Sequence, residues 1–302
     1  MTNMSNLPVG AKILSASASE VQDLGPLQPL LGTWTSAPGA GWNTISVPAP
    51  PDISNGTGFL LEIVPYIETL TFQPAVIAAN RGPVVDGEQV TQNVVGLIYE
   101  QKIISDCDID ACTSRGLGKG TEIHAETGMI LFTDNSDPGV SVARLGTIPH
   151  GDSILLMGSV EESERPDIPV IDTLPTFVNG DPVPPGYLEF SVNPFDNFND
   201  NNPNETLANQ VANQTIVSTT TLTLNSENQG GILNIPFIKT NVDATKMDCT
   251  YWIEEVQGDS GTFFQLQYSQ VINLVFPPAG APATELVNWP HADVNTLTKV
   301  SE

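Results

Sequence analysis

The sequence predicts an all-β protein, and three observations lead to that prediction. Its 25 prolines and 25 glycines are spread along 302 residues, which leaves little room for long helices. The segment Thr262–Phe276 alternates apolar and polar side chains, as a strand with one dry face does. Strand-like segments follow one another without alternating helices. We therefore expect a closed antiparallel meander β-barrel of about 8–10 strands, with a short N-terminal capping helix and long loop insertions.

A short helix is expected ahead of the first strand. Four leucines recur there at helical spacing, and two prolines limit the helix to one or two turns. These residues are Leu24, Leu27, Leu30 and Leu31, with Pro26 and Pro29 between them. The strands expected after the helix are Asn43–Val47, Phe59–Pro65, Ile67–Phe72, Val94–Ser105, Gly120–Phe132, Val140–Ile148, Ser153–Val160, Leu188–Ser191, Thr215–Leu224, Gly231–Ile238, Cys249–Gln257, Thr262–Phe276 and Val294–Val300.

We expect a single barrel domain over residues 23–302, preceded by an N-terminal extension over residues 1–22. A Pro- and acid-rich insertion is expected to cross one end of the barrel, and an Asn-rich one to be exposed or to act as a lid. The expected insertions lie near residues 80–91, 106–119, 161–187 and 193–213.

The charge balance limits the partners that this chain can have. Ten Lys plus Arg stand against 35 Asp plus Glu, which gives a net charge of −25. Such a surface repels phosphate backbones and anionic lipid heads, so neither nucleic acid nor a membrane is an expected partner. The N-terminus shows no basic region followed by an apolar run, and we expect a cytoplasmic protein. A homodimer remains open.

The three cysteines exclude a closed disulfide framework, because their number is odd. Cys107 and Cys112 are close enough in sequence to pair, which would leave Cys249 as a free thiol. The same stretch starts with the alternating aspartates of a calcium loop. It lacks that loop's glycine at the sixth position and its glutamate at the twelfth. A solvated hairpin tip is therefore the expected structure.

The chain has only three histidines, and they lie far apart in sequence: His124, His150 and His291. Imidazole is a neutral nitrogen ligand near neutral pH, and it binds zinc or the iron of haem. No close ligand pair of the zinc type is present, although a folded barrel can bring distant histidines together. The alternative is that each ring is a hydrogen-bonded structural or surface group.

Carboxylates offer two further patterns. Glu126 shares a strand face with His124, so it can orient the ring, shift its pKa or form an acid–base pair with it. A buried pair that closes the barrel floor is the structural alternative. Glu254 and Glu255 point to opposite faces of a strand and cannot act as a dyad. The sequence has no Gly-x-Ser-x-Gly, so a serine hydrolase of the α/β type is not expected.

Three phrases, taken in order, resemble the nitrobindin-like haem-binding proteins. They are "LGPLQPLLGTWTSAPGAGWNTI", "YIETLTF" and "HAETGMILF". The family has a helix followed by Gly-x-Trp and a glycine-rich turn, a Glu-bearing second strand, and a His-x-Glu-Thr/Ser-Gly strand. The resemblance covers roughly residues 24–160, and beyond them it depends on strand pattern and a late histidine. This chain is much longer than one nitrobindin domain.

The resemblance implies a calycin barrel, related to fatty-acid-binding proteins and lipocalins, that binds haem b through a late histidine. It implies His291 as the axial ligand, His150 in reserve, and His124 as a residue that supports the barrel. Trp34 and Tyr268 complete the cofactor-binding residues expected from it. Pro290, just before the expected ligand, removes a backbone donor from any strand there.

The function that the resemblance implies is haem binding, with small oxidants or diatomic gases such as nitric oxide, peroxynitrite or peroxide as the species handled. An enzyme of this kind would be a haem-dependent peroxidase or resemble a peroxynitrite isomerase. Three alternatives remain: a metal-free carrier of an apolar small molecule such as a fatty acid or pigment, an enzyme that uses His124 and Glu126 on an apolar substrate, and a purely structural barrel.

Overall fold

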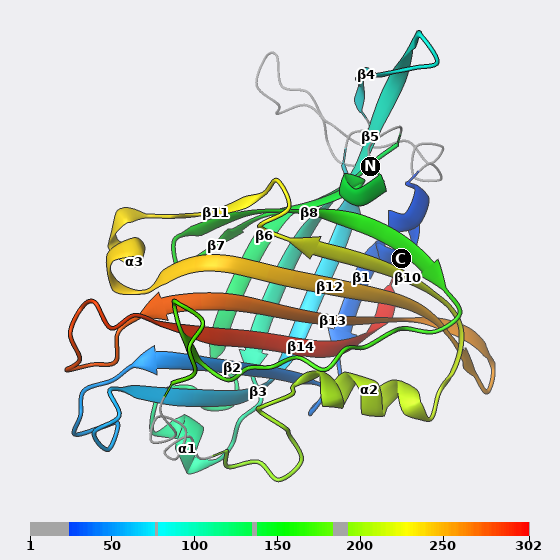
Figure 1. Cartoon of the computed structure of the whole chain (residues 1–302). Helices are drawn as coiled ribbons and strands as arrows, with labels where there is room; N and C mark the ends of the chain where they lie inside the picture. Colours follow the sequence, from blue (N-terminus) through cyan, green and yellow to red (C-terminus); the bar gives the residue numbers. More distant parts are fainter. Residues whose placement is uncertain (1–23, 76–77, 135–137, 184–192, 302) are drawn as a thin grey trace, which may run out of the picture.

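A computed structural model describes residues 24–75, 78–134, 138–183 and 193–301. Ten antiparallel strands close into a ring, which confirms the predicted barrel (Figure 1). The ring order is β3 (Phe59–Pro74), β2 (Gly41–Pro48), β14 (Val287–Ser301), β13 (Gly261–Phe276), β12 (Asp243–Gly258), β10 (Thr215–Asn225), β8 (Asp152–Ser163), β7 (Val142–Ile148), β6 (Glu122–Thr133) and β5 (Glu88–Ser105), which pairs with β3 again.

Two short strands share one place in this ring. β2 pairs with β3 over residues 59–66, and β1 (Gly32–Ser36) pairs with the rest of β3 over residues 69–72. Both also pair with β14, so together they cover the length of a single barrel strand. The remaining elements are η3 (Gly25–Leu30), β4 (Ala78–Val85), α1 (Asp110–Thr113), η4 (Pro138–Val140), β9 (Thr176–Phe177), α2 (Asn204–Ala212), β11 (Gly231–Asn234) and α3 (Pro236–Asn241).

Several predicted strands have different bounds in the structure. Phe59–Pro65 and Ile67–Phe72 form one continuous strand, β3. The prediction of a strand over Gly231–Ile238 is wrong in its second half, because Pro236 begins α3 there. The last strand starts earlier than predicted and includes Pro290, which lies outside the residues 292–294 that β2 pairs. The predicted strand Leu188–Ser191 and the N-terminal extension lie outside the described residues.

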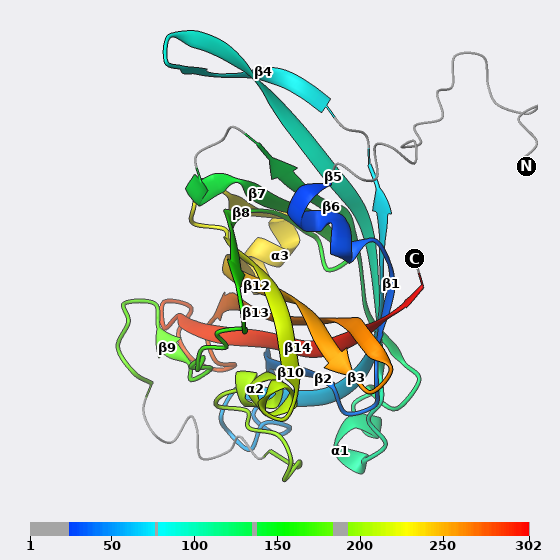
Figure 2. The same ribbon diagram turned by 90° about the vertical axis from the view of Figure 1, so that its right-hand side faces the viewer.

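η3 plugs one end of the barrel, as the leucine spacing predicts (Figure 2, blue helix). Leu24, Leu27 and Leu30 are fully buried in the main apolar cluster. Trp34 follows the helix, and its indole Nε1 donates a hydrogen bond to the Leu30 carbonyl at 2.7 Å. This ring fixes the short helix to the first strand, since a helix of six residues is not stable alone.

Two facing glycines make room for a tyrosine inside the barrel. Gly128 on β6 pairs with Gly146 on β7, and Tyr99 of β5 lies over both. The hydroxyl of Tyr99 then donates a hydrogen bond to Glu126. The Glu-Thr-Gly phrase after His124 thus has a packing explanation.

The Gly128→Ala variant should lose about 1–3 kcal/mol of unfolding free energy, the usual cost of overpacking a core. A Cβ at residue 128 would meet the Leu145 carbonyl oxygen and approach the Tyr99 ring to 2.7 Å. Urea unfolding measures this loss. Gly231→Ala is the matched control, because a Cβ at residue 231 has nothing within 4 Å. Equal stability of the two variants would contradict the packing.

The described parts of two long insertions cover the outer wall of the barrel. Residues 164–183 and 193–214 pack on the outside of β2, β3 and β12–β14, with α2 alongside β14 (Figure 1). Trp42 of β2 stacks on Phe198 with ring centroids 4.4 Å apart, and Leu207 of α2 is fully buried in the same cluster. The described part of the Pro- and acid-rich insertion therefore lies on the outer wall, where Trp42 and its neighbours form an apolar face.

This outer layer buries a carboxylate. Glu254 of β12 is fully buried, and its Oε2 accepts a hydrogen bond from Gln265 Nε2 at 2.6 Å. Its Oε1 has no hydrogen-bond partner among the described residues. Burial raises the pKa of Glu254 to about 7, although the hydrogen bond from Gln265 and the charge of Arg165 lower it.

The raised pKa predicts a pH dependence of stability that Glu254→Gln removes. Glu254 ionises near its ordinary pKa in the unfolded chain and near pH 7 in the folded chain. Between these two pH values the folded chain holds a proton that the unfolded chain has lost. Stability should therefore fall from about pH 4.5 to pH 7, by at most roughly 3 kcal/mol from this group. Urea unfolding of wild type and variant at pH 5 and pH 8 measures the difference. An identical pH dependence in both would refute the prediction.

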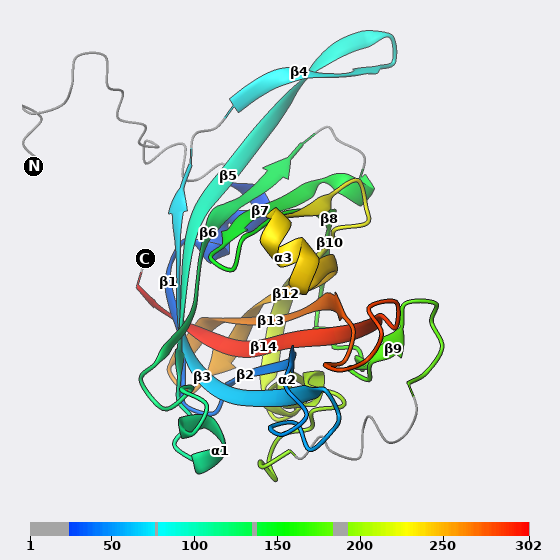
Figure 3. The same cartoon turned by 90° about the vertical axis from the view of Figure 1, so that its left-hand side faces the viewer.

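The loop after β5 is closed by a disulfide between Cys107 and Cys112, as the spacing suggests, and Cys249 is a buried free thiol. Arg115 holds the loop to the barrel through an ion pair with Glu62, at 2.7 Å. No group of three His, Cys, Asp or Glu side chains able to hold a metal ion occurs in the described ranges, here or elsewhere. Across those same ranges, no helix is long and apolar enough to cross a membrane. The insertion near residues 80–91 is a β4–β5 hairpin that projects from the barrel (Figures 1–3).

Candidate functional site: a histidine-lined cavity

The three histidines line a single cavity of about 330 Å³ at the α3 end of the barrel, the end away from η3. Figure 3 views the barrel from this side. The volume is at the lower limit of the range typical of small-molecule sites, about 300–1,000 Å³. His124 and His150 are 26 positions apart in sequence and His150 and His291 are 141 apart, yet all three line one chamber.

Strand register explains this convergence. His124 of β6 pairs with Ile103 of β5, and His291 of β14 pairs with Ile272 of β13, and these partners belong to the inward-facing rows. His150 lies in the turn between β7 and β8, at the mouth of the same end. Two strand positions and one turn therefore bring all the imidazoles of the chain together.

The walls of the cavity are mainly apolar. The inner faces of β2, β7, β8, β12 and β13, together with β11, α3 and the residue after α3, contribute the side chains of Ile45, Val47, Ile148, Ile154, Ile232, Ile238, Val242, Met247, Ile272 and Leu274. β11 and α3 form a cover over this end. The Ile235 amide between them donates a hydrogen bond to the Gly151 carbonyl at 2.9 Å, beside His150. The cover is thus attached to the turn that carries a histidine.

His291 is held in place by two polar neighbours. Its Nε2 lies 2.7 Å from Asn43 Nδ2 and 3.2 Å from Asp293 Oδ2. Asn43 also donates to Asp293 Oδ1 at 2.6 Å. Although burial opposes it, the charge and hydrogen bond of His291 hold the pKa of Asp293 below its usual range. A carboxylate that fixes one ring nitrogen is the usual support of a metal-binding histidine.

His124 and His150 lie close together, with ring centroids 6.1 Å apart. The buried Nε2 of His124 has no hydrogen-bond partner among the described residues and lies 3.5 Å from Glu126 Oε2. Burial and the charges of His124 and His291 lower the pKa of His150, so its ring is neutral at pH 7. Both rings therefore add imidazole nitrogen atoms to the lining of the chamber.

The floor of the cavity is a buried ion pair that sequence reasoning missed. Arg144 of β7 is almost fully buried, and its Nη2 donates to Glu126 Oε1 at 2.9 Å. It also donates to Gln270 Oε1 at 3.0 Å and to the Cys249 thiol at 3.3 Å. Burial alone would raise the pKa of Glu126, but Arg144 and the neighbouring hydrogen bonds lower it to about 2. The sequence signal for this pair is the spacing of Arg144, which lies on the same inward face of β7 as Val142 and Ile148.

Two residues expected to bind the cofactor lie elsewhere. Trp34 packs in the apolar plug beside η3. Tyr268 belongs to a buried network around Glu68, to which it and Asn295 each donate a hydrogen bond at 2.7 Å. Burial raises the pKa of Glu68 against these bonds. Neither Trp34 nor Tyr268 is among the residues that line the histidine cavity.

The geometry separates the chemical alternatives. A bare zinc ion needs several converging ligands, and the described residues offer no such group. Haem iron needs only one protein ligand, which a single ring supplies. Glu126 is already paired with Arg144, and a carboxylate with a pKa of about 2 is a weak proton acceptor at neutral pH. The cavity therefore suits binding better than acid–base catalysis by His124 and Glu126.

Comparisons with known proteins do not assign this chain to a family. No known protein family matches the sequence, and no curated protein does. Among solved structures, the chain is similar to that of Rv2717c from M. tuberculosis, at 18% sequence identity and a TM-score of 0.39. The match covers 91% of this chain and 98% of that one.

Proposed function

We propose that this protein binds haem b in the histidine cavity, with His291 as the axial ligand. The observation that supports this most strongly is that all three histidines of the chain line one largely apolar chamber. A structural role for each ring would not require them to meet. The phrases that resemble nitrobindin-like proteins point in the same direction.

The residues present fit a haem in two respects. The isoleucine-rich walls suit a flat apolar macrocycle, whose burial is favourable at about 25 cal/mol per Å². His291 has Asp293 and Asn43 on Nε2, and within the described residues its Nδ1 has no hydrogen-bond partner. When bound, haem would supply an iron that takes up diatomic gases or reacts with small oxidants such as peroxide or peroxynitrite, as the polarity of the pocket dictates.

A second function is favoured by a different observation. The Nε2 of His291 is already engaged by Asn43 and Asp293, and most of the lining is hydrocarbon. The same chamber therefore suits a metal-free carrier of an apolar molecule such as a fatty acid or pigment. In that case the acids in the lining, Glu126, Asp152 and Asp293, would disfavour an anionic ligand end inside.

A titration with haemin tests the first proposal against the second. The visible spectrum of the purified protein should show a shifted Soret band that saturates at one haem per chain. Absence of a shift, together with displacement of a fluorescent fatty-acid probe by unlabelled fatty acid, would favour the carrier. A protein that binds neither probe would contradict both functions.

The cellular location of the protein stays a prediction. The cytoplasmic location expected from the sequence is opposed by the Cys107–Cys112 disulfide, because structural disulfides are typical of oxidising compartments. A homodimer also stays a prediction, as do the single-domain boundaries. If the haem proposal holds, the peroxidase-like and peroxynitrite isomerase-like activities are the ones to assay.

A further inference from the structure

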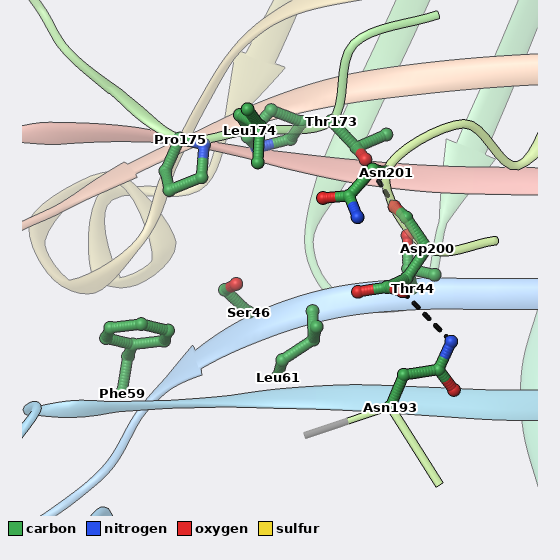
Figure 4. A pocket seen from close by; sticks show the side chains of 11 residues that line it. Thr44, Ser46, Phe59, Leu61, Thr173, Leu174, Pro175, Asn193, Asp200 and Asn201 are labelled. Carbon is green, nitrogen blue, oxygen red and sulfur yellow. Dashed lines mark hydrogen bonds between the residues drawn. The ribbon is translucent and has the colours of Figure 1, made fainter. Parts of the chain in front are cut away.

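A second cavity lies on the outside of the barrel, where the long insertions meet β2 and β3. Its volume is about 300 Å³, and Figure 4 shows the side chains around it. One wall is the barrel, with Ser46 of β2 and Phe59 of β3. The opposite wall is the outer layer, with Thr173, Asp200 and Asn201. β2 lies between this cavity and the histidine chamber, and its Ser46 lines both.

The outer wall of this cavity is built by hydrogen bonds within the insertions. Asn193 Nδ2 donates to Asp200 Oδ1 at 2.9 Å and to the Phe198 carbonyl at 2.8 Å. The hydroxyl of Thr173 donates to the Asp200 carbonyl, which joins the two insertions (Figure 4). Asp200 is thus held by both of its neighbours, although it lies in an Asn-rich loop.

Three polar groups at the cavity remain without a protein partner within the described residues. They are the Ser46 hydroxyl, the Asn201 carboxamide and the Asp200 Oδ2. Ser46 is only 8% exposed, so this hydroxyl lies in the cavity wall and not at the open surface. A carboxylate oxygen, an amide and a hydroxyl together can accept and donate several hydrogen bonds.

The rest of the lining is apolar, with Phe59, Leu61, Leu174 and Pro175. Among the described residues, no lysine, arginine or histidine lines the cavity, and Asp200 is the one ionisable residue that does. An anionic ligand would therefore meet a like charge with no compensating cation. The lining suits a ligand that carries hydroxyl groups for the polar side chains and offers C–H groups to Phe59.

We propose that this outer cavity binds a neutral saccharide ring. The hydroxyls of such a ring bond with Asp200, Asn201 and Ser46, while its C–H face packs near Phe59. Ligand sites commonly combine apolar walls with a few placed polar groups in this way. The proposal is independent of the haem site, because the two cavities lie on opposite sides of β2.

The test is an NMR titration of the full chain with D-glucose, with D-glucose 6-phosphate as the charged comparison. We expect glucose to shift resonances of residues 44–46 and 200–201, with an affinity in the millimolar range typical of a ligand of this size. Glucose 6-phosphate should bind more weakly. Asn201→Ala should weaken glucose binding at least about tenfold, since a placed polar group is lost.

Two controls keep the test decisive. Asn179→Ala changes an exposed asparagine of the same outer layer that does not line the cavity, and it should leave glucose binding unchanged. His291→Ala should also leave it unchanged. Glucose shifts that disappear in His291→Ala but persist in Asn201→Ala would place the sugar inside the barrel and overturn the proposal. The absence of any shift at residues 44–46 and 200–201 would overturn it as well.

Discussion

The Arg144→Met variant should unfold with about 3–5 kcal/mol less free energy than the wild type, the usual cost of removing one member of a buried ion pair. Methionine would leave the buried Glu126 carboxylate without the guanidinium that pairs with it. It would also remove the donors to Gln270 and Cys249. Urea unfolding at pH 7, followed by circular dichroism, measures the loss.

The double variant Glu126→Gln with Arg144→Met is the matched control. It removes the uncompensated charge, so we expect it to regain part of the stability that the single variant loses. A lower pH should also reduce the loss of unfolding free energy in the single variant, because Glu126 can then bind a proton. A single variant within about 1 kcal/mol of the wild type would show that the pair is not buried as described.

The His291→Ala variant should bind haemin at least about 100-fold more weakly than the wild type, which corresponds to about 3 kcal/mol or more. The variant loses the nitrogen that we propose as axial ligand, and it leaves Asp293 without its ring partner. The titration follows the Soret band as haemin is added. Circular dichroism establishes that the variant is still folded.

The other two histidines are the controls for this assignment. His150→Ala and His124→Ala should keep a Soret band, with affinities within about tenfold of the wild type, because each removes only contacts in the chamber. Loss of the band in His150→Ala but not in His291→Ala would move the axial ligand to the β7–β8 turn and leave haem binding in place. Equal bands in all three variants would contradict ligation by any of them.

Much of the fold could be predicted because it depends on local patterns. The period of two over residues 262–276 predicts β13, and the leucine spacing predicts the cap at η3. The short separation of Cys107 and Cys112 allows their disulfide. The outer layer could not be found in this way, because α2 has a weak apolar face and is stabilised by contacts with Trp42 and its neighbours, which are distant in sequence.

The site depends on long-range register, which a single sequence does not reveal. His124 and His291 meet only because β6 and β14 both present them inward at the same end of a closed ring. The charge balance of the floor needs Arg144 and Glu126 side by side, and these come from different strands. The strand pattern predicts that Glu126 shares the face of His124, whereas the ion pair with Arg144 depends on the pairing of β6 with β7.

The central proposal is that one largely apolar chamber receives a haem and surrounds it with all three imidazoles. Gallium protoporphyrin IX, a diamagnetic analogue of haem, allows the imidazole nitrogen resonances to be recorded, and single variants assign the three signals. We predict that all three signals shift on binding and that the His291 signal shifts most. Binding that leaves the imidazole resonances unchanged, or that moves only one of the three, would contradict the account.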